Sequence, residues 1–266
     1  MLSVDFDRLA LKEGGTLLDL GSGGGRHSFE AMVRRERAVA VDLDESGLRG
    51  ISEYAAGLCG SESSDLHKVE VLVADARNLP FKDDAFDSAI CSEVLEHLDE
   101  ELAVIEEIKR VTKPNAIVAL TVPSFLPEVV NWSISKEYHS AKGGHVRIYT
   151  KSELTTLVKG VGFSVLGFAR VHALHSPYWW IKSWVGVGKS SHPLASWYES
   201  WLVRDMFSPN PLMRAIEERT NWMLGKSLVV YLRNDKENDK ENDKENDKEN
   251  DKENDKENDK VEGAEG

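Results

Sequence analysis

The stretch from Thr16 to Gly25 constrains the fold more than any other part of the chain. Residues 16–20 form a mostly apolar run with the length of a strand that is covered on both faces. Gly21 and Gly23 follow at once, and glycine adopts backbone angles that other residues avoid and lets a ligand approach the main chain closely. A helical pattern then runs to Arg35, and the amide groups at its start would point at that ligand. This unit predicts a nucleotide or nucleoside site.

The spacing of the glycines separates two kinds of nucleotide site. The dinucleotide fingerprint G-x-G-x-x-G needs a further glycine three positions after Gly23, where the sequence has Arg26. The pattern that fits is D-x-G-x-G-x-G, which runs from Asp19 through Gly21 to Gly25. The turn therefore disfavours an NAD(P) site, although a glycine-rich turn alone does not identify its ligand.

An acidic residue follows the next apolar segment. Residues 38–41 predict a second strand, and Asp42 comes directly after it, about 20 positions after Gly21, the offset at which an acid meets a ribose in such folds. A carboxylate suits this position because its two oxygens can accept hydrogen bonds from two adjacent hydroxyl groups. An acid that only caps the helix expected from Glu45 is the alternative, and Asp44 suits that role better. We therefore predict Asp42 as a ribose ligand.

Two further segments follow predicted strands in the same manner. Residues 69–74 predict a third strand, and the run D-A-R-N-L-P-F follows at 75–81. Residues 85–91 predict a fourth strand, and S-E-V-L-E-H-L follows at 92–98. Together with the glycine turn, these segments resemble the class I S-adenosylmethionine (SAM)-dependent methyltransferases, particularly the type 11 small-molecule group. The resemblance covers residues 16 to about 166 and the last strand.

The resemblance implies SAM as the cofactor and suggests a role for individual residues. Asp42 would bind the ribose, Asp75 would accept the exocyclic amine of the adenine, and the Ala76 amide would serve a ring nitrogen. Ser92 and Glu93 would lie near the methionine part, beyond the carboxyl ends of the strands. A competing interpretation of Asp75 is an acid that only turns the chain at the end of a strand. The predicted cofactor-binding residues are Asp19, Gly21, Ser22, Gly23, Gly25, Asp42, Leu43, Asp75, Ala76, Ser92 and Glu93.

Strands and helices alternate along the chain, which predicts an α/β fold. Residues 101–112 form an amphipathic helical pattern, and residues 116–122 predict a fifth strand. The apolar stripe expected on that helix consists of Leu102, Ile105, Ile108 and Val111. Five alternations favour a doubly wound, mostly parallel, Rossmann-like sheet. Residues 163–171 and 228–232 predict two more strands, and the resemblance implies a seven-stranded sheet whose last strand is antiparallel to its neighbour.

The first of two insertions, residues 124–150, ends in the run H-V-R-I-Y-T, which begins at His145. The family often has such a run before a helix, and residues 151–161 predict that helix. His145 is our first candidate for a general base that faces the methyl acceptor. In the alternative interpretation, His145 and Arg147 only pin the loop to the sheet. We interpret His97 as a packing or loop-tethering residue, and we predict no metal ligands.

The second insertion, residues 175–225, precedes the last strand and is rich in aromatic residues. It holds six of the seven tryptophans of the chain. A helix is expected to open at Asn210-Pro211 and to end at Gly225. Three interpretations remain open: a helical cover that buries its aromatic side chains against the sheet, an apolar acceptor pocket, or a surface that enters a membrane interface, where Trp and Tyr accumulate.

The composition of the C-terminal segment separates it from the rest of the chain. From Asn234 the tetrad N-D-K-E repeats, and residues 235–266 hold 7 Lys against 7 Asp and 8 Glu, so more than half of the net charge of −13 lies there. This segment cannot bury enough apolar surface to order itself. We therefore predict a methyltransferase domain at 1–233 and a disordered tail at 234–266. The mildly acidic remainder lacks the basic patches that nucleic acid requires.

Location and function follow as expectations. Cys59 and Cys91 provide neither a disulfide framework nor metal-ligand spacing, and neither a signal peptide nor a membrane span is recognisable. A cytoplasmic enzyme, in peripheral contact with a membrane through residues 175–225, is the expectation. We predict transfer of a methyl group from SAM to a small acceptor that is apolar or lipid-linked. The alternatives are an NAD(P)-dependent oxidoreductase and a non-catalytic SAM-binding interaction protein.

Overall fold

The computed structural model describes residues 2–59, 69–135, 144–186, 192–208 and 210–236. Its strands are β1 (Thr16–Leu20), β2 (Arg37–Asp42), β3 (Val69–Val73), β4 (Phe86–Ser92), β5 (Thr112–Pro123), β6 (Phe163–Val171) and β7 (Ser227–Asn234). They form one seven-stranded sheet in the order β3-β2-β1-β4-β5-β7-β6. β7 is antiparallel to both neighbours, and the other pairs are parallel. The predicted sheet is therefore confirmed.

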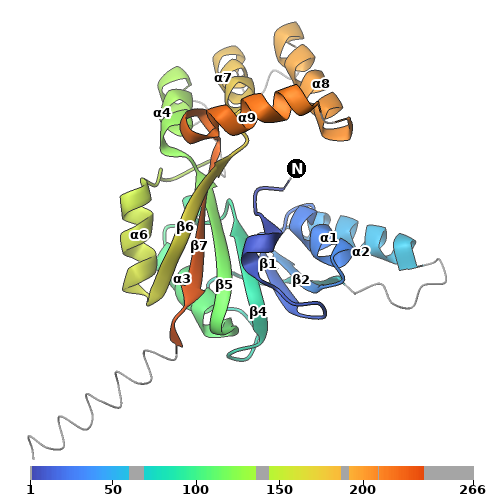
Figure 1. The fold of residues 1–266 in the computed structure, drawn as a ribbon, viewed down its shortest axis with the longest axis vertical. Helices are drawn as coiled ribbons and strands as arrows, with labels where there is room; N and C mark the ends of the chain where they lie inside the picture. The colour runs from blue at the N-terminus through green and yellow to red at the C-terminus, as the bar shows by residue number, and fades with distance from the viewer. Residues whose placement is uncertain (1, 60–68, 136–143, 187–191, 209, 237–266) are drawn as a thin grey trace, which may run out of the picture.

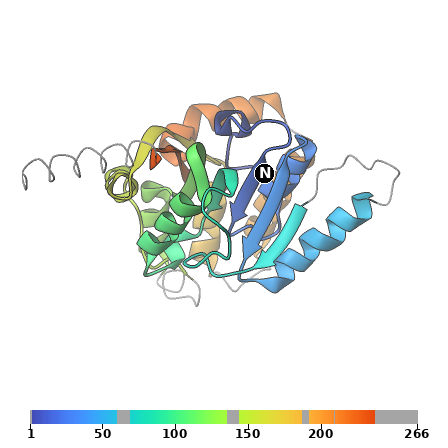
Figure 2. The ribbon, with the colours of Figure 1, turned by 90° about the horizontal axis from the view of Figure 1, so that it is seen from below.

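The helices connect these strands and cover the sheet (Figures 1 and 2). They are η1 (Phe6–Leu9), α1 (Arg26–Val33), α2 (Glu45–Cys59), η2 (Leu95–His97), α3 (Glu101–Val111), α4 (Phe125–Ile134), α6 (Lys151–Gly160), α7 (His175–Val185), α8 (Pro193–Phe207) and α9 (Pro211–Leu224). Among the residues described, none of these helices is both long and apolar enough to span a bilayer.

Alternate side chains of the buried strands supply two cores, one on each face of the sheet. Leu18 of β1 packs on the face that also holds Ile108 of α3 and Leu154 of α6. Leu17, the preceding residue, packs on the opposite face with Phe6 of η1. Because successive residues of a strand point to opposite faces, a strand covered on both sides must be apolar at nearly every position. This requirement explains the unbroken apolar runs from which the strands were predicted.

Helices α4, α7, α8 and α9 form a cap at one end of the sheet (Figure 1). Because α4 follows β5 directly and α7 lies just after β6, the cap covers the carboxyl ends of the parallel strands. The predicted helix boundaries at Asn210 and Gly225 are confirmed, since the Asn210 side chain accepts a hydrogen bond from the Leu212 amide at 2.9 Å and Gly225 follows the last helical residue.

Two details around α3 differ from the sequence prediction. Leu102 was expected on the buried stripe but is 46% exposed, whereas Val104 is fully buried. At about 100° per residue, Leu102 lies roughly 120° around the helix from Ile108, outside the stripe. The following strand also begins earlier than predicted, because β5 starts at Thr112 and includes Pro114. A register shift in its pairing with β4 between Phe86 and Ser88 accompanies this early start.

The first three residues of the charged repeat, 234–236, still pack against the domain. Asn234 is fully buried in β7, and its side-chain amide donates to the carbonyl of Lys109 at 2.9 Å and to that of Thr112 at 3.1 Å. The Lys236 ammonium donates to the carbonyls of Arg110 and Thr112. The packed domain therefore extends to Lys236, beyond the predicted boundary at 233. The rest of the predicted tail, 237–266, lies outside the described residues.

Candidate cofactor site

The turn after β1 requires glycine at two positions. Gly21 has φ +69°, and a Cβ atom there would lie 2.1 Å from the Cγ2 atom of Val94. Gly25 has φ +77° at the start of α1, and its Cβ would lie 2.6 Å from Ile51. Positive φ angles and this crowding exclude larger residues. The turn therefore brings main-chain atoms close to the space beyond the strand ends.

The Asp42 carboxylate joins this turn to the end of β2. One oxygen accepts a hydrogen bond from the Gly23 amide at 2.8 Å, and the other accepts one from the Asp44 amide at 2.9 Å. Each carboxylate oxygen keeps a further lone pair, so both can still accept a ligand hydroxyl. Asp44 instead caps α2, since its carboxylate accepts from the Ser46 amide at 3.0 Å. The capping role of Asp44 agrees with the sequence analysis, and the ribose role of Asp42 stays a prediction.

A cavity of about 250 Å³ lies beside the turn. Its lining consists of Leu20, Gly21, Val41, Asp42, Leu43, Ala74, Asp75, Ala76, Glu93, Val94, His97 and Leu98. These residues come from the carboxyl ends of β1 to β4 and the segments that follow them, which is where ligands bind in open α/β sheets. Six of the predicted cofactor residues meet here: Gly21, Asp42, Leu43, Asp75, Ala76 and Glu93.

The Asp75 carboxylate forms an ion pair at the cavity wall. The Arg77 guanidinium lies 2.6 Å from one Asp75 oxygen and also pairs with Glu100 at 2.8 Å. The hydrogen bond from Arg77 holds the pKa of Asp75 below its ordinary value. Asp75 is therefore a charged acceptor at the cavity wall, and it also turns the chain, so both predicted roles are compatible with its position.

The other predicted cofactor residues lie behind the cavity lining. Asp19 is fully buried, and one of its oxygens accepts hydrogen bonds from the Ser28 amide at 2.9 Å and the Ser28 hydroxyl at 2.6 Å. It therefore fixes the first turn of α1 beneath the glycines. The remaining members of this group are Ser22, Gly23, Gly25 and Ser92. Gly23 supports the site through its amide bond to Asp42.

Comparison with known proteins identifies this kind of site. Residues 18–120 match the family described as "Methyltransferase domain", and this span includes the glycine turn and the whole cavity lining. Residues 18–120 are thereby assigned to the class I SAM-dependent methyltransferases, and the rest of the chain lies outside this match. Membership implies SAM as the methyl donor, in agreement with the sequence prediction.

Relatives within this methyltransferase family act on different acceptors. The demethylmenaquinone methyltransferase of Corynebacterium glutamicum is 34% identical over 133 residues, which are 49% of this chain and 51% of that protein. The tRNA (carboxymethyluridine(34)-5-O)-methyltransferase of Arabidopsis thaliana is 34% identical over 116 residues, 42% of this chain and 25% of that protein. The chain thus spans about half the length of the first relative and a quarter of the second.

The same fold occurs in solved structures across most of the chain. The cyclase SpnF aligns with a TM-score of 0.56 and 19% identity, and the alignment covers 85% of this chain and 77% of SpnF. This likeness concerns the fold alone, because a shared fold does not fix an activity. The alignment extends well beyond residues 18–120 and shows that most of the chain has a known architecture.

The sequence analysis missed one cation at the site. Arg26, the first residue of α1, donates a hydrogen bond to the Ser92 hydroxyl at 2.9 Å, and Ser92 is hydrogen-bonded in turn to Thr121. A positive charge at a helix N-terminus is unfavourable unless an anion compensates it. A cation at this position therefore indicated an anionic ligand nearby. In the sequence analysis, Arg26 was considered only as a mismatch to the dinucleotide fingerprint.

His145, the predicted general base, does not line the cavity but contacts His97, which does. Its Nδ1 is 2.5 Å from a carboxylate oxygen of Glu128 on α4. Its ring lies edge-on to that of His97, with 5.0 Å between the centroids. Burial is the largest influence on the pKa of Glu128 and would raise it, but the hydrogen bond and charge of His145, together with Asn131 and Lys226, hold this pKa below its ordinary value.

Glu96 completes this group. It is fully buried, and burial, followed by the charge of Glu93, raises the pKa of Glu96 well above its ordinary value. Together with His97, which lines the cavity, these side chains form a polar cluster at the cofactor site. Sequence reasoning interpreted His97 only as a packing or tethering residue.

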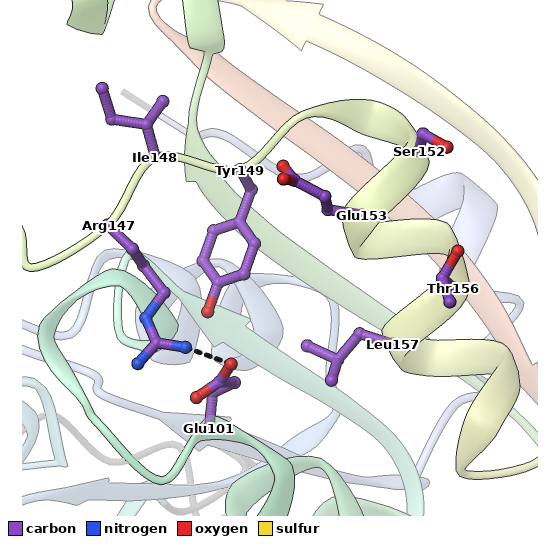
Figure 3. Close-up of a pocket in the computed structure, with 8 residues that line it drawn as sticks. All are labelled: Glu101, Arg147, Ile148, Tyr149, Ser152, Glu153, Thr156 and Leu157. Carbon is purple, nitrogen blue, oxygen red and sulfur yellow. Dashed lines mark ion pairs between the residues drawn. The ribbon is translucent and has the colours of Figure 1, made fainter.

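Arg147 has the pinning role that was the alternative for this loop. Its guanidinium pairs with Glu101 at the start of α3 and donates to the carbonyl of Asp99 at 3.2 Å. Figure 3 shows this ion pair beside the buried ring of Tyr149, at a hollow of about 480 Å³ between the loop and α6. The hollow shares no lining residue with the cofactor cavity. The loop is therefore pinned by Arg147, whereas His145 contacts α4.

A second histidine pair lies where β6 leads into the cap. Nε2 of His172 is 3.1 Å from the Ser3 hydroxyl, and the rings of His172 and His175 are 5.5 Å apart. Burial lowers the pKa of His172 to about 3 and that of His175 to about 4, so both rings are neutral at physiological pH. These residues had no sequence signal, because neither belongs to a recognisable motif.

Proposed function

We propose that this chain transfers the methyl group of SAM to a small acceptor that is apolar or lipid-linked. The observation that carries the proposal is the cavity in which Gly21, Asp42 and Asp75 meet. Its donor and acceptor set fits an adenosyl group: a carboxylate for the ribose hydroxyls, a second for the adenine amine, and apolar walls from Leu43 and Ala76. When bound, SAM supplies a methyl group that is already activated for transfer.

The methionine end of the cofactor needs opposite charges for its ammonium and carboxylate groups. Glu93 lines the cavity and can accept hydrogen bonds from the ammonium. Arg26, held by Ser92 at the start of α1, can bind the carboxylate together with the helix N-terminus. Glu93 and Arg26 thus provide the opposite charges that the zwitterionic methionine end of SAM requires. A nicotinamide ring has no such requirement. This pattern favours SAM over NAD(P) as the ligand.

The residues around the site would act mainly by positioning reactants and by excluding water. Val94 and Leu98 provide apolar walls beside Gly21. A proton that leaves a hydroxyl or amine acceptor needs a nearby base, and the His97–His145 pair lies beside the cavity. Glu128 would stabilise the imidazolium form of His145 through their hydrogen bond. This arrangement supports His145 as the candidate general base.

The cap supports an apolar acceptor. Three of its tryptophans keep most of their surface exposed: Trp184 at 72%, Trp197 at 63% and Trp222 at 69%. Leu126 on α4 and Leu212 on α9 are also about half exposed or more. Exposed tryptophans concentrate at membrane interfaces and at binding surfaces. The family relative that methylates demethylmenaquinone takes a lipid-linked substrate, which is the class we propose for this chain.

The decisive experiment combines cofactor binding with product detection. Calorimetry of one sample with SAM, S-adenosylhomocysteine (SAH) and NADH should give binding of the first two and none of the third. Incubation with SAM carrying an isotopically labelled methyl group and a panel of quinols, phenols and a tRNA mixture should label an apolar quinol or phenol. Binding of NADH alone would refute the cofactor, and label only in the tRNA would refute the acceptor class. Cofactor binding without label in any acceptor would favour the non-catalytic alternative.

Membrane contact through residues 175–225 has its own test. A variant with Trp184, Trp197 and Trp222 changed to Gln should sediment less with liposomes than the parent chain does. The matched control changes Val33 and Tyr54 to Gln, because these side chains are 74% and 57% exposed but lie on α1 and α2, outside the cap. Equal sedimentation of all three proteins would contradict the contact.

A further inference from the structure

Glu96 is a buried carboxyl group without a partner. Its relative exposure is 0%, and neither of its oxygens accepts a hydrogen bond. Burying such a group without compensation costs several kcal/mol in principle, so buried carboxyls normally have hydrogen-bond donors, a cation or a metal ion beside them. The nearby ammonium of Lys226 is directed to Glu93, 3.8 Å away. Among the described residues, none donates a hydrogen bond to the Glu96 carboxyl group, so a cation beside it would compensate for its burial.

Two imidazoles complete a group of the kind that binds metal ions. Glu96, His97 and His145 each offer one ligand atom, and these atoms all lie within 4.8 Å of one another. Glu96 and His97 are adjacent in η2, whereas His145 comes from the loop before α6. His97 is exposed at the cavity, which gives an ion a route from solvent.

The outer contacts of the two histidines match those of metal ligands. Nδ1 of His145 faces the Glu128 carboxylate at 2.5 Å, and Nδ1 of His97 lies 3.3 Å from the carbonyl oxygen of Gly144. A ligating histidine almost always donates its other ring N–H to a carboxylate or a backbone carbonyl, which fixes the tautomer. Here both contacts favour the tautomer with the lone pair on Nε2. Glu128 itself accepts a hydrogen bond from the Trp132 indole at 3.1 Å, which fixes its orientation.

We propose that Glu96, His97 and His145 bind one divalent transition-metal ion beside the cofactor cavity, with Glu128 and the Gly144 carbonyl as outer partners. Two imidazoles and one carboxylate suit Zn²⁺, Mn²⁺, Fe²⁺ or Co²⁺, whereas Mg²⁺ and Ca²⁺ prefer oxygen ligands. The sequence analysis predicted no metal ligands because His145 is far from the Glu96-His97 pair along the chain, and only the fold brings them together.

An ion at this place would have a chemical role that rests on the proposed function. By binding an acceptor oxygen, it would lower the pKa of the hydroxyl that is to be methylated, and the proton would leave to solvent. His145 cannot both ligate the ion and take the proton, so with the ion bound it would not act as the general base. Metal binding itself is independent of methyl transfer, and it can be measured without an acceptor.

The test uses the full chain without an affinity tag, freed of metal by a chelator and dialysed. Titration with Co²⁺, followed by visible absorption, and with Zn²⁺, followed by calorimetry, should give one site per chain. Glu96→Gln and His145→Gln should each weaken binding at least tenfold, and Glu128→Gln by about 10–100-fold. Since a buried variant can misfold, His97→Gln at the exposed ligand provides an independent test, with the thermal unfolding midpoint as the check on folding.

The control lies in the second histidine group. His172, His175 and Glu217 also place ligand atoms within 4.8 Å of one another, so His175→Gln removes a comparable histidine elsewhere. This variant should bind Co²⁺ as the parent does. Absence of binding in the parent, binding that survives both Glu96→Gln and His97→Gln, or loss of binding only in His175→Gln would each overturn the proposal. SAH affinity in the same samples reports on the cofactor site separately.

Discussion

Replacing Asp42 by Asn removes the negative charge of the ribose site while keeping its shape. In the wild-type chain the two carboxylate oxygens accept the amides of Gly23 and Asp44 at 2.8 and 2.9 Å. The Asn side chain has one acceptor oxygen, so one of these amides, or one ribose hydroxyl, must face an NH₂ group instead. An unpaired group costs about 1–3 kcal/mol when buried, and the partial exposure of Asp42 favours the lower part of this range. We expect SAH to bind roughly 5–30-fold more weakly, which corresponds to about 1–2 kcal/mol.

Asp44→Asn is the matched control for this measurement. It makes the same change of charge two residues away, but the Asp44 side chain caps α2 through Ser46 and does not line the cavity. It should change the free energy of unfolding little, because Asn is about as good an N-cap as Asp, and it should leave SAH affinity unchanged. Calorimetry with SAH and thermal unfolding of both variants would decide. Equal dissociation constants for the two variants would refute the assignment of Asp42 to the ribose.

Three further predictions test other parts of the structure. Arg26→Gln should weaken SAH binding about tenfold while sparing methylthioadenosine, which lacks the amino-acid carboxylate; equal losses for both ligands in calorimetry would contradict the role of Arg26. Burial raises the pKa of Glu36 to about 7, so ionisation of this group in the folded state lowers stability as the pH rises from about 4.5 to 7. Glu36→Gln should therefore raise the free energy of unfolding by about 1–2 kcal/mol at pH 8 and by less at pH 5. Denaturant titrations at the two pH values measure this difference. A chain that ends at Arg233 should melt at a lower temperature than one that ends at Lys236, because it loses the buried hydrogen bonds of Asn234; identical melting temperatures would show that these contacts add no stability.

The strands and the cofactor turn could be predicted because their signals are local. A strand covered on both faces must be apolar along its length, so residues 16–20 identify β1 without knowledge of its neighbours. Gly21 is required by its own φ angle and by the side chain of Val94. Asp42 ends β2 and Asp75 follows β3 by two residues, and the parallel sheet then brings them to the same edge.

Features that depend on contacts between distant segments were not predictable in the same way. Arg26 reaches Ser92, and Glu128 reaches His145, only after the sheet and α4 have assembled. Leu102 is a different case, because helical periodicity already places it roughly 120° from Ile108 and outside the buried stripe. Sequence patterns therefore gave the ligand-binding edge of the sheet, but not the pairs of side chains that complete it.

The two halves of the site also differ in what stabilises them. The cofactor half is built from strand ends and a glycine turn that adjoin the buried core through Leu20 and Val41, so its residues serve folding and binding together. Three tryptophans of the cap do not stabilise the fold in this way, because Trp184, Trp197 and Trp222 are each more than 60% exposed. An exposed Trp contributes little burial to stability, and contiguous exposed apolar surface is a liability for a soluble chain. Their exposure supports the proposed contact of the cap, which lies at the end of the sheet, with an apolar partner outside the chain.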